Sequence, residues 1–178
     1  MTVIILDDSQ KKYSKIFNEE ILKFGDKVVV FKANELNIKP CLACGSCSGK
    51  TFGKCVIEDD MQKILSEIVK SKKVIFISPV IYGGVSFHIK KILDRISSIG
   101  DPRYFVKYGE LVKNMRVKDL EYYLIGIKNN INEKGTSIFI ELHKENVKIM
   151  GVLGRALVIE GKSLKKVIGM ALGDVVYE

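Results

Sequence analysis

The chain has 178 residues, of which 47% are hydrophobic and 28% charged, with three prolines and no tryptophan. This length suits one domain that buries its own core, and the composition excludes a disordered or low-complexity chain. No apolar run approaches the roughly 18 residues of a membrane span. The stretch from Met1 to Asp8 lacks the basic and apolar segments of a signal peptide, so we expect a reducing, cytoplasmic location.

The net charge of +8 arises from 29 Lys and Arg against 21 Asp and Glu. An excess of cations attracts anionic ligands such as phosphates, and it also admits nucleic acid as a partner. The basic residues are scattered as singles and pairs, however, without aromatic residues at regular intervals between them. The pattern therefore favours a solvated basic surface over nucleic-acid binding.

Strands and helices alternate along the first half of the chain. The short apolar run 3–6 is typical of a strand buried on both faces, and a second such run covers 28–31. Between them, apolar residues recur at helical spacing over 13–24. Another helix is expected from Asp59, with Gln62 three residues on as its capping partner.

The second half continues the alternation. We expect a strand at 74–77 stopped by Ser78-Pro79, then a helix from about 86 and an irregular polar stretch at 98–120. A strand at 122–127 and a helix at 136–146 follow. The chain then continues with a long strand at 149–159 broken by two glycines and a helical tail at 163–171. Five strands alternating with helices predict an α/β fold with a five-stranded parallel sheet covered on both faces.

All four cysteines lie close together, at Cys41, Cys44, Cys47 and Cys55, with the spacing C-x2-C-x2-C-x7-C. A disulfide framework would staple distant segments instead, and it would not persist in a reducing compartment. Clustered thiolates select zinc, Cu(I) or an iron–sulfur cluster. The two x2 gaps resemble the ferredoxin run that binds [4Fe–4S], whereas zinc more often pairs two separated knuckles. The spacing leaves a cluster, zinc and free or redox-active thiols open.

Parallel topology brings the loops that follow the strands to one edge of the sheet, where ligands bind. The cysteine segment, about 39–57, follows the second strand, so we expect its sulfurs beside that pocket. The loop after the third strand supplies further candidate ligand contacts at Pro79, Val80, Tyr82, Gly83 and Gly84. Adjacent glycines allow a planar ligand to approach the backbone, and Tyr82 can lie against its ring. A plain turn covered by the tyrosine is the alternative.

The residues from Cys41 to Arg95 resemble a known family. The cysteine motif, the following Asp59-Asp60-Met61, the run Ser78-Pro79-Val80-Ile81-Tyr82, and the helix end Lys90-x-x-x-Asp94-Arg95 are similar to those of flavodoxin-like NAD(P)H-dependent FMN reductases. Within that family they look most like the iron–sulfur flavoproteins of anaerobic prokaryotes. The resemblance covers about a third of the chain, and it is faint elsewhere.

The resemblance implies a flavodoxin-like three-layer sandwich, one domain over residues 1–178, with FMN at the carboxyl edge of the sheet. It implies a [4Fe–4S] cluster on the four cysteines that exchanges electrons with the flavin, and NAD(P)H as the electron donor. It also implies a redox partner protein or a small-molecule acceptor, and a homodimer or homotetramer whose copies complete each other's sites. No catalytic side chain is predicted, because a flavin carries the redox chemistry itself.

The loop after the first strand departs from the family pattern. Relatives carry a glycine- and hydroxyl-rich loop for the FMN phosphate, whereas this loop has no glycine and has carboxylates at Asp7 and Asp8. Ser9, Lys11 and Ser14 are the candidate phosphate contacts, and like-charge repulsion from the two aspartates weakens such binding unless they point away.

Lys128 and Asn129 follow the fourth strand and are candidate contacts to the flavin ring or ribityl chain, or simply a polar turn. Asp94 and Arg95 are expected to make an ion pair or a helix-end contact. Two functions therefore remain: an FMN-dependent oxidoreductase, and a flavodoxin-fold protein without flavin that acts as a metal- or thiol-based binding module.

Overall fold

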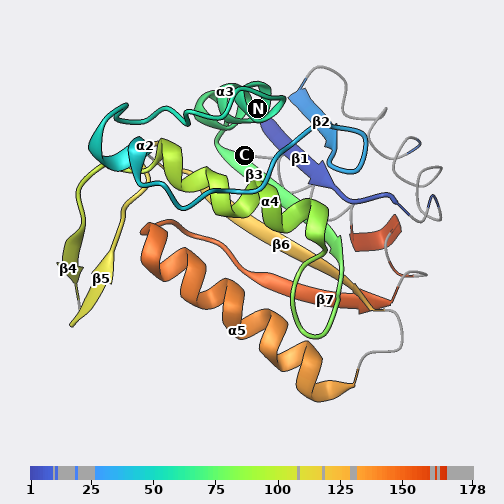
Figure 1. Ribbon diagram of the computed structural model, residues 1–178. Helices are drawn as coiled ribbons and strands as arrows, with labels where there is room; N and C mark the ends of the chain where they lie inside the picture. The colour runs from blue at the N-terminus through green and yellow to red at the C-terminus, as the bar shows by residue number, and fades with distance from the viewer. Residues whose placement is uncertain are drawn as a thin grey trace.

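The main sheet has five parallel strands in the order β2-β1-β3-β6-β7 (Figure 1). The computed structural model describes residues 1–9, 11, 19, 27–107, 109–117, 119–128, 132–160, 163 and 165–167. The strands are β1 (Thr2–Leu6), β2 (Val28–Lys32), β3 (Lys73–Pro79), β6 (Glu121–Lys128) and β7 (Ala156–Glu160). This strand order is that of flavodoxin, which confirms the predicted fold class.

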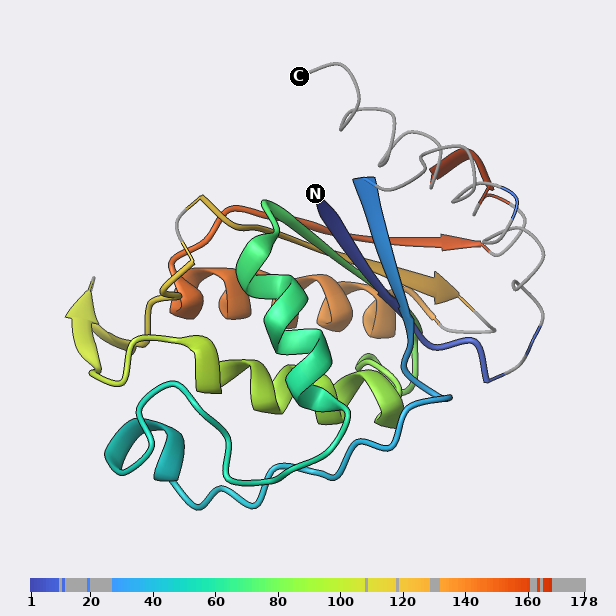
Figure 2. The same cartoon turned by 90° about the horizontal axis from the view of Figure 1, so that it is seen from above.

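Three helices lie together on one face of the sheet, as Figure 2 shows: α3 (Met61–Lys70), α4 (Phe87–Ile96) and α5 (Glu133–Met150). Alternate side chains of the strands, among them Val3, Ile5 and Phe76, pack against this helical layer in the larger hydrophobic core. The intervening side chains, such as Ile4, Leu6 and Ile75, form a second core on the opposite face. The period-two alternation of a strand thus places apolar residues on both faces, as the continuous apolar runs predicted.

Two short elements lie outside these layers. The helix α2 (Ser46–Gly49) belongs to the cysteine segment, and it packs against the 3-10 helix η2 (Ser97–Ile99), which directly follows α4. Among the helices that the structure describes, none combines the length and the apolar character needed to cross a bilayer.

Side-chain caps fix where the helices begin. Gln62 Oε1 accepts a hydrogen bond from Asp59 N at 3.1 Å, so Gln62 acts as the predicted capping partner, and Asp59 Oδ1 accepts from Met61 N at 3.0 Å. The residue directly before α3, Asp60, makes no side-chain capping bond. Ser86 caps α4 by accepting from Ile89 N. Asn132 Oδ1 accepts from Gly135 N at 2.9 Å, which starts α5 earlier than its apolar spacing alone indicated.

The expected irregular stretch at 98–120 contains a β-hairpin, so that prediction was wrong. Strands β4 (Phe105–Lys107) and β5 (Glu110–Val112) pair antiparallel, with Val106 opposite Leu111, and they project beyond the main sheet (Figure 1). Each strand has only three residues, which is too short for a period-two pattern to stand out in the sequence.

The expected long strand at 149–159 was also wrong in its first half. The helix α5 continues to Met150 and ends at Gly151, which has φ 63° and ψ 35° in the left-handed region. The strand β7 begins only at Ala156. The strand expected to stop before Ser78 instead runs through Pro79, which pairs with Ile127 of β6. The helix expected at 13–24 lies outside the described residues, apart from Glu19, and so does most of the tail at 163–171.

Candidate functional site

The carboxyl ends of β1, β3 and β6 bring three predicted ligand loops to one edge of the sheet. Asp7 N donates to Ile77 O at 3.0 Å, and Val80 N donates to Ile127 O at 3.1 Å, so the first residues of these loops continue the strand pairing. Lys128 ends β6 opposite Glu160 of β7. Of the predicted contacts, Ser9, Lys11, Lys128 and residues 79–84 are thus placed at this edge, while Ser14 and Asn129 lie outside the described residues.

The loop between β3 and α4 contains a tight two-residue turn. Ile81 and Gly84 exchange backbone hydrogen bonds of 2.9 and 2.8 Å, and the two residues between them, Tyr82 and Gly83, have φ of 50° and 83°. Positive φ at both central positions is characteristic of a type I′ turn and is rare for tyrosine. A Cβ on Gly83 would lie 3.0 Å from Ile138 on α5. The turn holds Tyr82 fully exposed, with its ring free to face a flat ligand.

The loop after β1 carries a buried negative charge. Asp7 and Asp8 are only 7% and 4% exposed, and Asp7 Oδ1 accepts hydrogen bonds from Ser9 N at 2.9 Å and Ser9 Oγ at 2.5 Å. Burial works to raise the pKa of Asp7, but hydrogen bonds from Ser86 and Ser9 outweigh it and hold that pKa below its usual value. The Ser9 hydroxyl is therefore donated to Asp7, and Lys11 is exposed close by in sequence.

The cysteine segment lies away from this edge, contrary to the sequence-based expectation. After β2 the chain runs back along α4, and α2 reaches η2 at the far end of that helix (Figure 2). Lys113 Nζ donates to Ser48 Oγ at 2.6 Å, which fixes α2 beside the end of β5. Because α4 runs antiparallel to the strands, its last turn lies at the amino edge of the sheet. The sulfurs are therefore not beside the ligand edge of their own chain.

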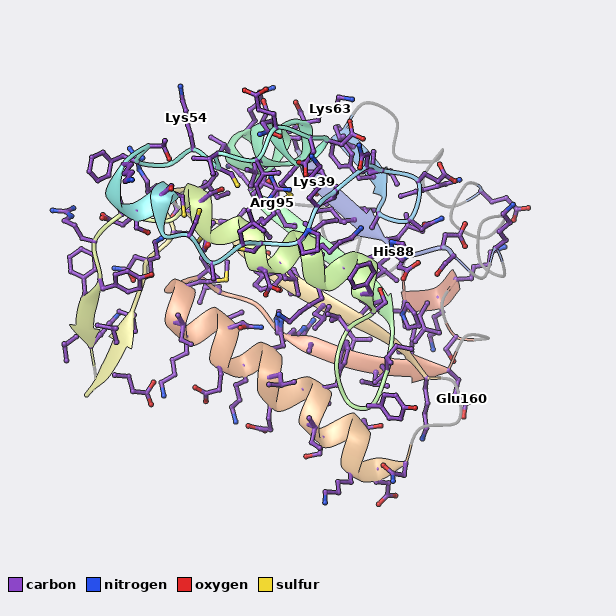
Figure 3. The ribbon with its side chains drawn as sticks, in the orientation of Figure 1. Lys39, Lys54, Lys63, His88, Arg95 and Glu160 are labelled. Atoms are coloured by element: carbon purple, nitrogen blue, oxygen red, sulfur yellow. The ribbon has the colours of Figure 1, made fainter. Side chains whose placement is uncertain are left out.

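A buried arginine ties the two ends of the cysteine segment together. Arg95 and Asp59 form an ion pair in which neither side chain is exposed. The guanidinium also donates to Lys39 O at 3.1 Å and to Ile57 O at 3.0 Å, and Asp59 Oδ2 accepts from Lys39 N at 2.8 Å. Figure 3 shows Arg95 and Lys39 where the segment passes α4. The chain before Cys41 and the chain after Cys55 are thereby held at one point.

The four cysteines are free thiols, with Cys41 and Cys44 exposed and Cys47 and Cys55 half-buried. Hydrogen bonds from Ser46 lower the pKa of the Cys44 thiol below its usual value. Burial by itself would lower the pKa of Arg95, but the hydrogen bonds and charge interactions with Asp59 and Cys55 outweigh this effect and raise that pKa. Throughout the described part of the chain, no three His, Cys, Asp or Glu side chains lie together closely enough to hold a metal ion.

The sequence of residues 1–113 matches the family model of the NADPH-dependent FMN reductases. The chain belongs to this family. The match includes the first loop, the cysteine segment, the Tyr82 turn and α4. The predicted family is therefore confirmed.

Curated relatives support the branch. An iron–sulfur flavoprotein of Methanocaldococcus jannaschii is 44% identical over 61 residues, which is 34% of this chain and 30% of the relative. One from Methanosarcina thermophila is 38% identical over 66 residues, covering 37% of this chain and 33% of the relative. The chain thus aligns with only about a third of these relatives' own length.

Solved structures support the fold. An FMN-dependent NADH-azoreductase from Bacillus anthracis, in complex with FMN, superposes with a TM-score of 0.63 over 98% of both chains at 12% identity. The azoreductase AzrA gives a TM-score of 0.62 over 98% of this chain and 96% of its own, also at 12% identity. At such low identity the likeness shows the shared fold alone.

Arg95 is the site residue whose role the sequence left undecided between an ion pair and a helix-end contact. Its position, three residues after Ile92 and one before Ile96, lies on the apolar stripe of α4, and a cation on a buried stripe requires a buried partner. The neighbouring Asp94 forms an exposed pair with Lys90 instead. The sequence signal for a buried ion pair was therefore a charged residue at a position on the apolar side of α4.

Proposed function

We propose that this chain is an FMN-dependent oxidoreductase of the cytoplasm, folded as one domain over residues 1–178, that uses NAD(P)H as its electron donor. The observation that carries the proposal is the type I′ turn at Tyr82-Gly83, which presents an exposed aromatic ring at the carboxyl edge of a flavodoxin-type sheet. The family match over residues 1–113 includes this turn.

The carboxyl edge offers better contacts for the ring of a flavin than for its phosphate. Pro79, Val80, Gly83 and Gly84 supply backbone beside which a flat ring fits, and Tyr82 supplies a ring face. Lys128 and Asn129 are the further proposed contacts to the flavin ring or the ribityl chain. When bound there, FMN supplies hydride and single-electron chemistry.

The phosphate contacts are proposed at Lys11, Ser9 and Ser14. Lys11 offers an exposed positive charge, and Ser9 serves only if its hydroxyl turns away from Asp7. The buried carboxylate of Asp7 repels a phosphate dianion, so we expect FMN to bind more weakly than it does to a glycine-rich loop.

We further propose that Cys41, Cys44, Cys47 and Cys55 hold a [4Fe–4S] cluster. The donor set fits, because it consists of four free thiols, Cys44 has a lowered pKa, and a buried guanidinium lies beside Cys55. Such a cluster supplies one-electron transfer when bound. Arg95 and Asp59 hold the ends of the segment together. In the described structure no three of the thiols lie close enough to hold a metal, so we expect the loop between these ends to fold around the cluster as it binds.

The separation of the two sites favours a homodimer or homotetramer. The ten-residue helix α4 is about 15 Å long. The Tyr82 turn lies before its amino end, and the cysteine segment packs beside its carboxyl end. Leu42 and Phe52 in that segment are 71% and 60% exposed, as is typical of a surface that a partner covers. We propose that the segment of one copy meets the flavin edge of another, and that electrons leave to a redox partner protein or a small-molecule acceptor.

The test is titration of the full chain with FMN, followed by its melting temperature. A ligand of the native state must raise stability, by about 2.7 kcal/mol at a hundredfold excess over Kd. A rise with FMN, together with NAD(P)H-dependent bleaching of the bound flavin, supports the oxidoreductase. No rise at millimolar FMN contradicts it.

The buried charge of Asp7 favours a second candidate, a flavin-free protein of this fold that binds metal or acts through its thiols. For this function we expect stoichiometric zinc or iron on the cysteines and no response of the melting temperature to FMN. The response of the melting temperature to FMN therefore separates the two candidates.

A further inference from the structure

Arg95 has more hydrogen-bond donors than its described partners use. A guanidinium carries five N–H groups. In the described structure three of them donate, to the carboxylate of Asp59 and to the carbonyl oxygens of Lys39 and Ile57. Arg95 is 1% exposed, and its Nε is buried without a hydrogen-bond partner among the described residues. Because a buried donor without an acceptor is destabilising, this N–H indicates that a further acceptor belongs beside the guanidinium.

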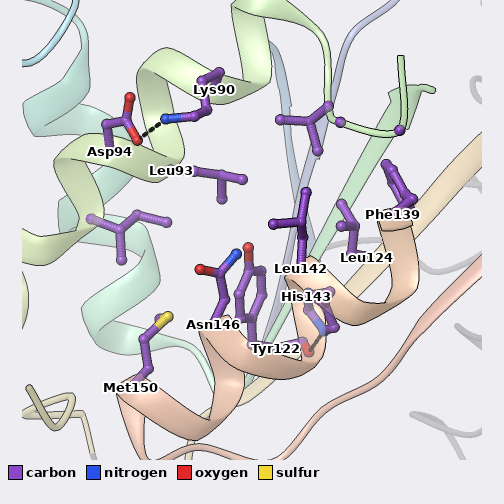
Figure 4. Close-up of a pocket in the computed structure, with 14 residues that line it drawn as sticks. Lys90, Leu93, Asp94, Tyr122, Leu124, Phe139, Leu142, His143, Asn146 and Met150 are labelled. Carbon is purple, nitrogen blue, oxygen red and sulfur yellow. Dashed lines mark hydrogen bonds and ion pairs between the residues drawn. The ribbon is translucent and has the colours of Figure 1, made fainter. Parts of the chain in front are cut away.

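The carboxylates near Arg95 do not accept from this remaining donor. Asp94 lines the pocket between α4 and α5, where it pairs with Lys90 across one helical turn (Figure 4). Asp59 Oδ2 already accepts from both Lys39 N and Arg95 Nη1. The two acids are therefore engaged by other donors, and the acceptor has to be sought in the cysteine segment.

Cys55 lies within reach of the guanidinium. It is half-buried and stands two residues before Ile57, whose carbonyl oxygen accepts from Arg95 Nη2 at 3.0 Å. Two residues of chain span at most about 7 Å. Burial works to lower the pKa of Arg95, but hydrogen bonds and charge interactions with Asp59 and Cys55 raise it, which is consistent with a thiol beside the cation. Cys55 is thus the cysteine that the described structure brings to Arg95.

A donor at a ligand sulfur affects the redox properties of an iron–sulfur centre. Hydrogen bonds to the sulfurs and burial are among the features that set its reduction potential. A donor that carries a positive charge stabilises the more negative, reduced state and so raises the potential. A hydrogen bond to a charged group is worth on the order of a factor of ten in an equilibrium constant.

We propose that Arg95 is a positioning residue for the [4Fe–4S] cluster, in which an unused guanidinium N–H donates to the sulfur of Cys55 and raises the reduction potential. The inference rests on the proposed binding of a cluster by the four cysteines, and it assigns a redox role to a residue outside that set. The side chain that anchors the ends of the cysteine segment thereby also acts on one of its sulfurs.

The test is a redox titration, followed by electron paramagnetic resonance, of the full chain loaded with iron and sulfide without oxygen. The double variant Asp59→Asn/Arg95→Met removes the donor, keeps the local net charge unchanged and leaves no buried carboxylate without a counterion. At a fixed potential we expect its ratio of reduced to oxidised cluster to fall about tenfold, which is about 59 mV for a one-electron couple.

Arg116→Met is the matched control. Arg116 is exposed, and a Cβ on Gly53 would lie 2.9 Å from its Nη1, so it borders the same cysteine segment from the solvent side. This substitution removes a positive charge that solvent screens, and it should change the ratio less than about threefold. Equal shifts in the double variant and in Arg116→Met would overturn the proposed hydrogen bond.

A second readout uses the wild-type chain and does not depend on the double variant folding. With ¹⁵N-arginine incorporated, pulsed electron paramagnetic resonance of the reduced sample should detect a ¹⁵N coupling that persists in Arg116→Met. A missing coupling, its loss in Arg116→Met, or a double variant that binds iron at the wild-type potential would each overturn this inference alone. A chain that takes up no iron would contradict the proposed cluster and this inference with it, so the iron content separates the two failures.

Discussion

Arg95 and Asp59 lie 36 residues apart in sequence and form an ion pair from which solvent is fully excluded. The same guanidinium reaches the carbonyl groups of Lys39 and Ile57 on either side of the cysteine segment. One side chain of α4 thus determines where a loop of 17 intervening residues, 40 to 56, begins and ends. The cysteines are placed by a buried charge pair and its backbone hydrogen bonds.

Removing one partner of this pair should be strongly destabilising. Arg95→Met leaves Asp59 buried without its counterion, which costs about 3–5 kcal/mol. For a chain of this size that corresponds to a fall in melting temperature of roughly 6–20 °C, measured by calorimetry or circular dichroism. Asp94→Asn breaks only the exposed pair with Lys90 and should cost less than about 1 kcal/mol. Equal losses in the two variants would show that the buried pair does not hold the segment.

The sheet was predictable because buried parallel strands are continuous apolar runs, and four of them stood out between helical patterns. Val3 to Leu6 and Tyr122 to Ile127 were placed within a residue of their observed bounds. The strand order followed from the fold that the cysteine and Tyr82 motifs suggested. The local sequence thus predicted the strands, and the family resemblance predicted their order in the sheet.

The position of the cysteines could not be predicted in the same way. Topology fixes the edge at which a loop starts, but a long loop can return along a helix, as this one does beside α4 (Figure 2). Its course is set by tertiary contacts, those of Arg95 with Lys39 and of Lys113 with Ser48. The partner of Arg95 and the buried environment of His143 likewise arise from residues distant in sequence.

His143 should make stability depend on pH. Its folded-state pKa of about 4 lies below the ordinary value of 6.5, so the neutral form is favoured by folding. Its contribution is fully present above about pH 6.5 and is lost as the pH falls from there toward 4. The loss approaches about 3 kcal/mol, since one pKa unit corresponds to 1.36 kcal/mol.

Urea unfolding at several pH values between 7 and 4 measures this dependence. The free energy of unfolding of His143→Phe should decline less steeply over that range than that of the wild type, because the variant has no imidazole to protonate there. Parallel curves for the two proteins would argue that the ring is not held neutral by the fold.

Tyr82 should contribute to FMN affinity without contributing to stability. Its side chain is fully exposed, so Tyr82→Ala removes no packing from the core. Loss of aromatic contact with a flat ring is worth about 0.5–1.5 kcal/mol, or a 2- to 12-fold rise in the Kd for FMN. Fluorescence titration of FMN measures it.

Tyr104→Ala is the matched control for this substitution. Tyr104 is 56% exposed and lies next to the β4–β5 hairpin, away from the carboxyl edge. Its removal should leave the Kd for FMN unchanged. If both variants bind FMN as the wild type does, the flavin does not rest on the Tyr82 turn.

The most direct measurement is the content of flavin, iron and acid-labile sulfide in chain purified without oxygen. About one FMN and roughly four iron and four sulfide are expected per chain. The variant Cys47→Ser should lose the iron while retaining the FMN. A colourless protein that takes up neither flavin nor iron on reconstitution would contradict the account.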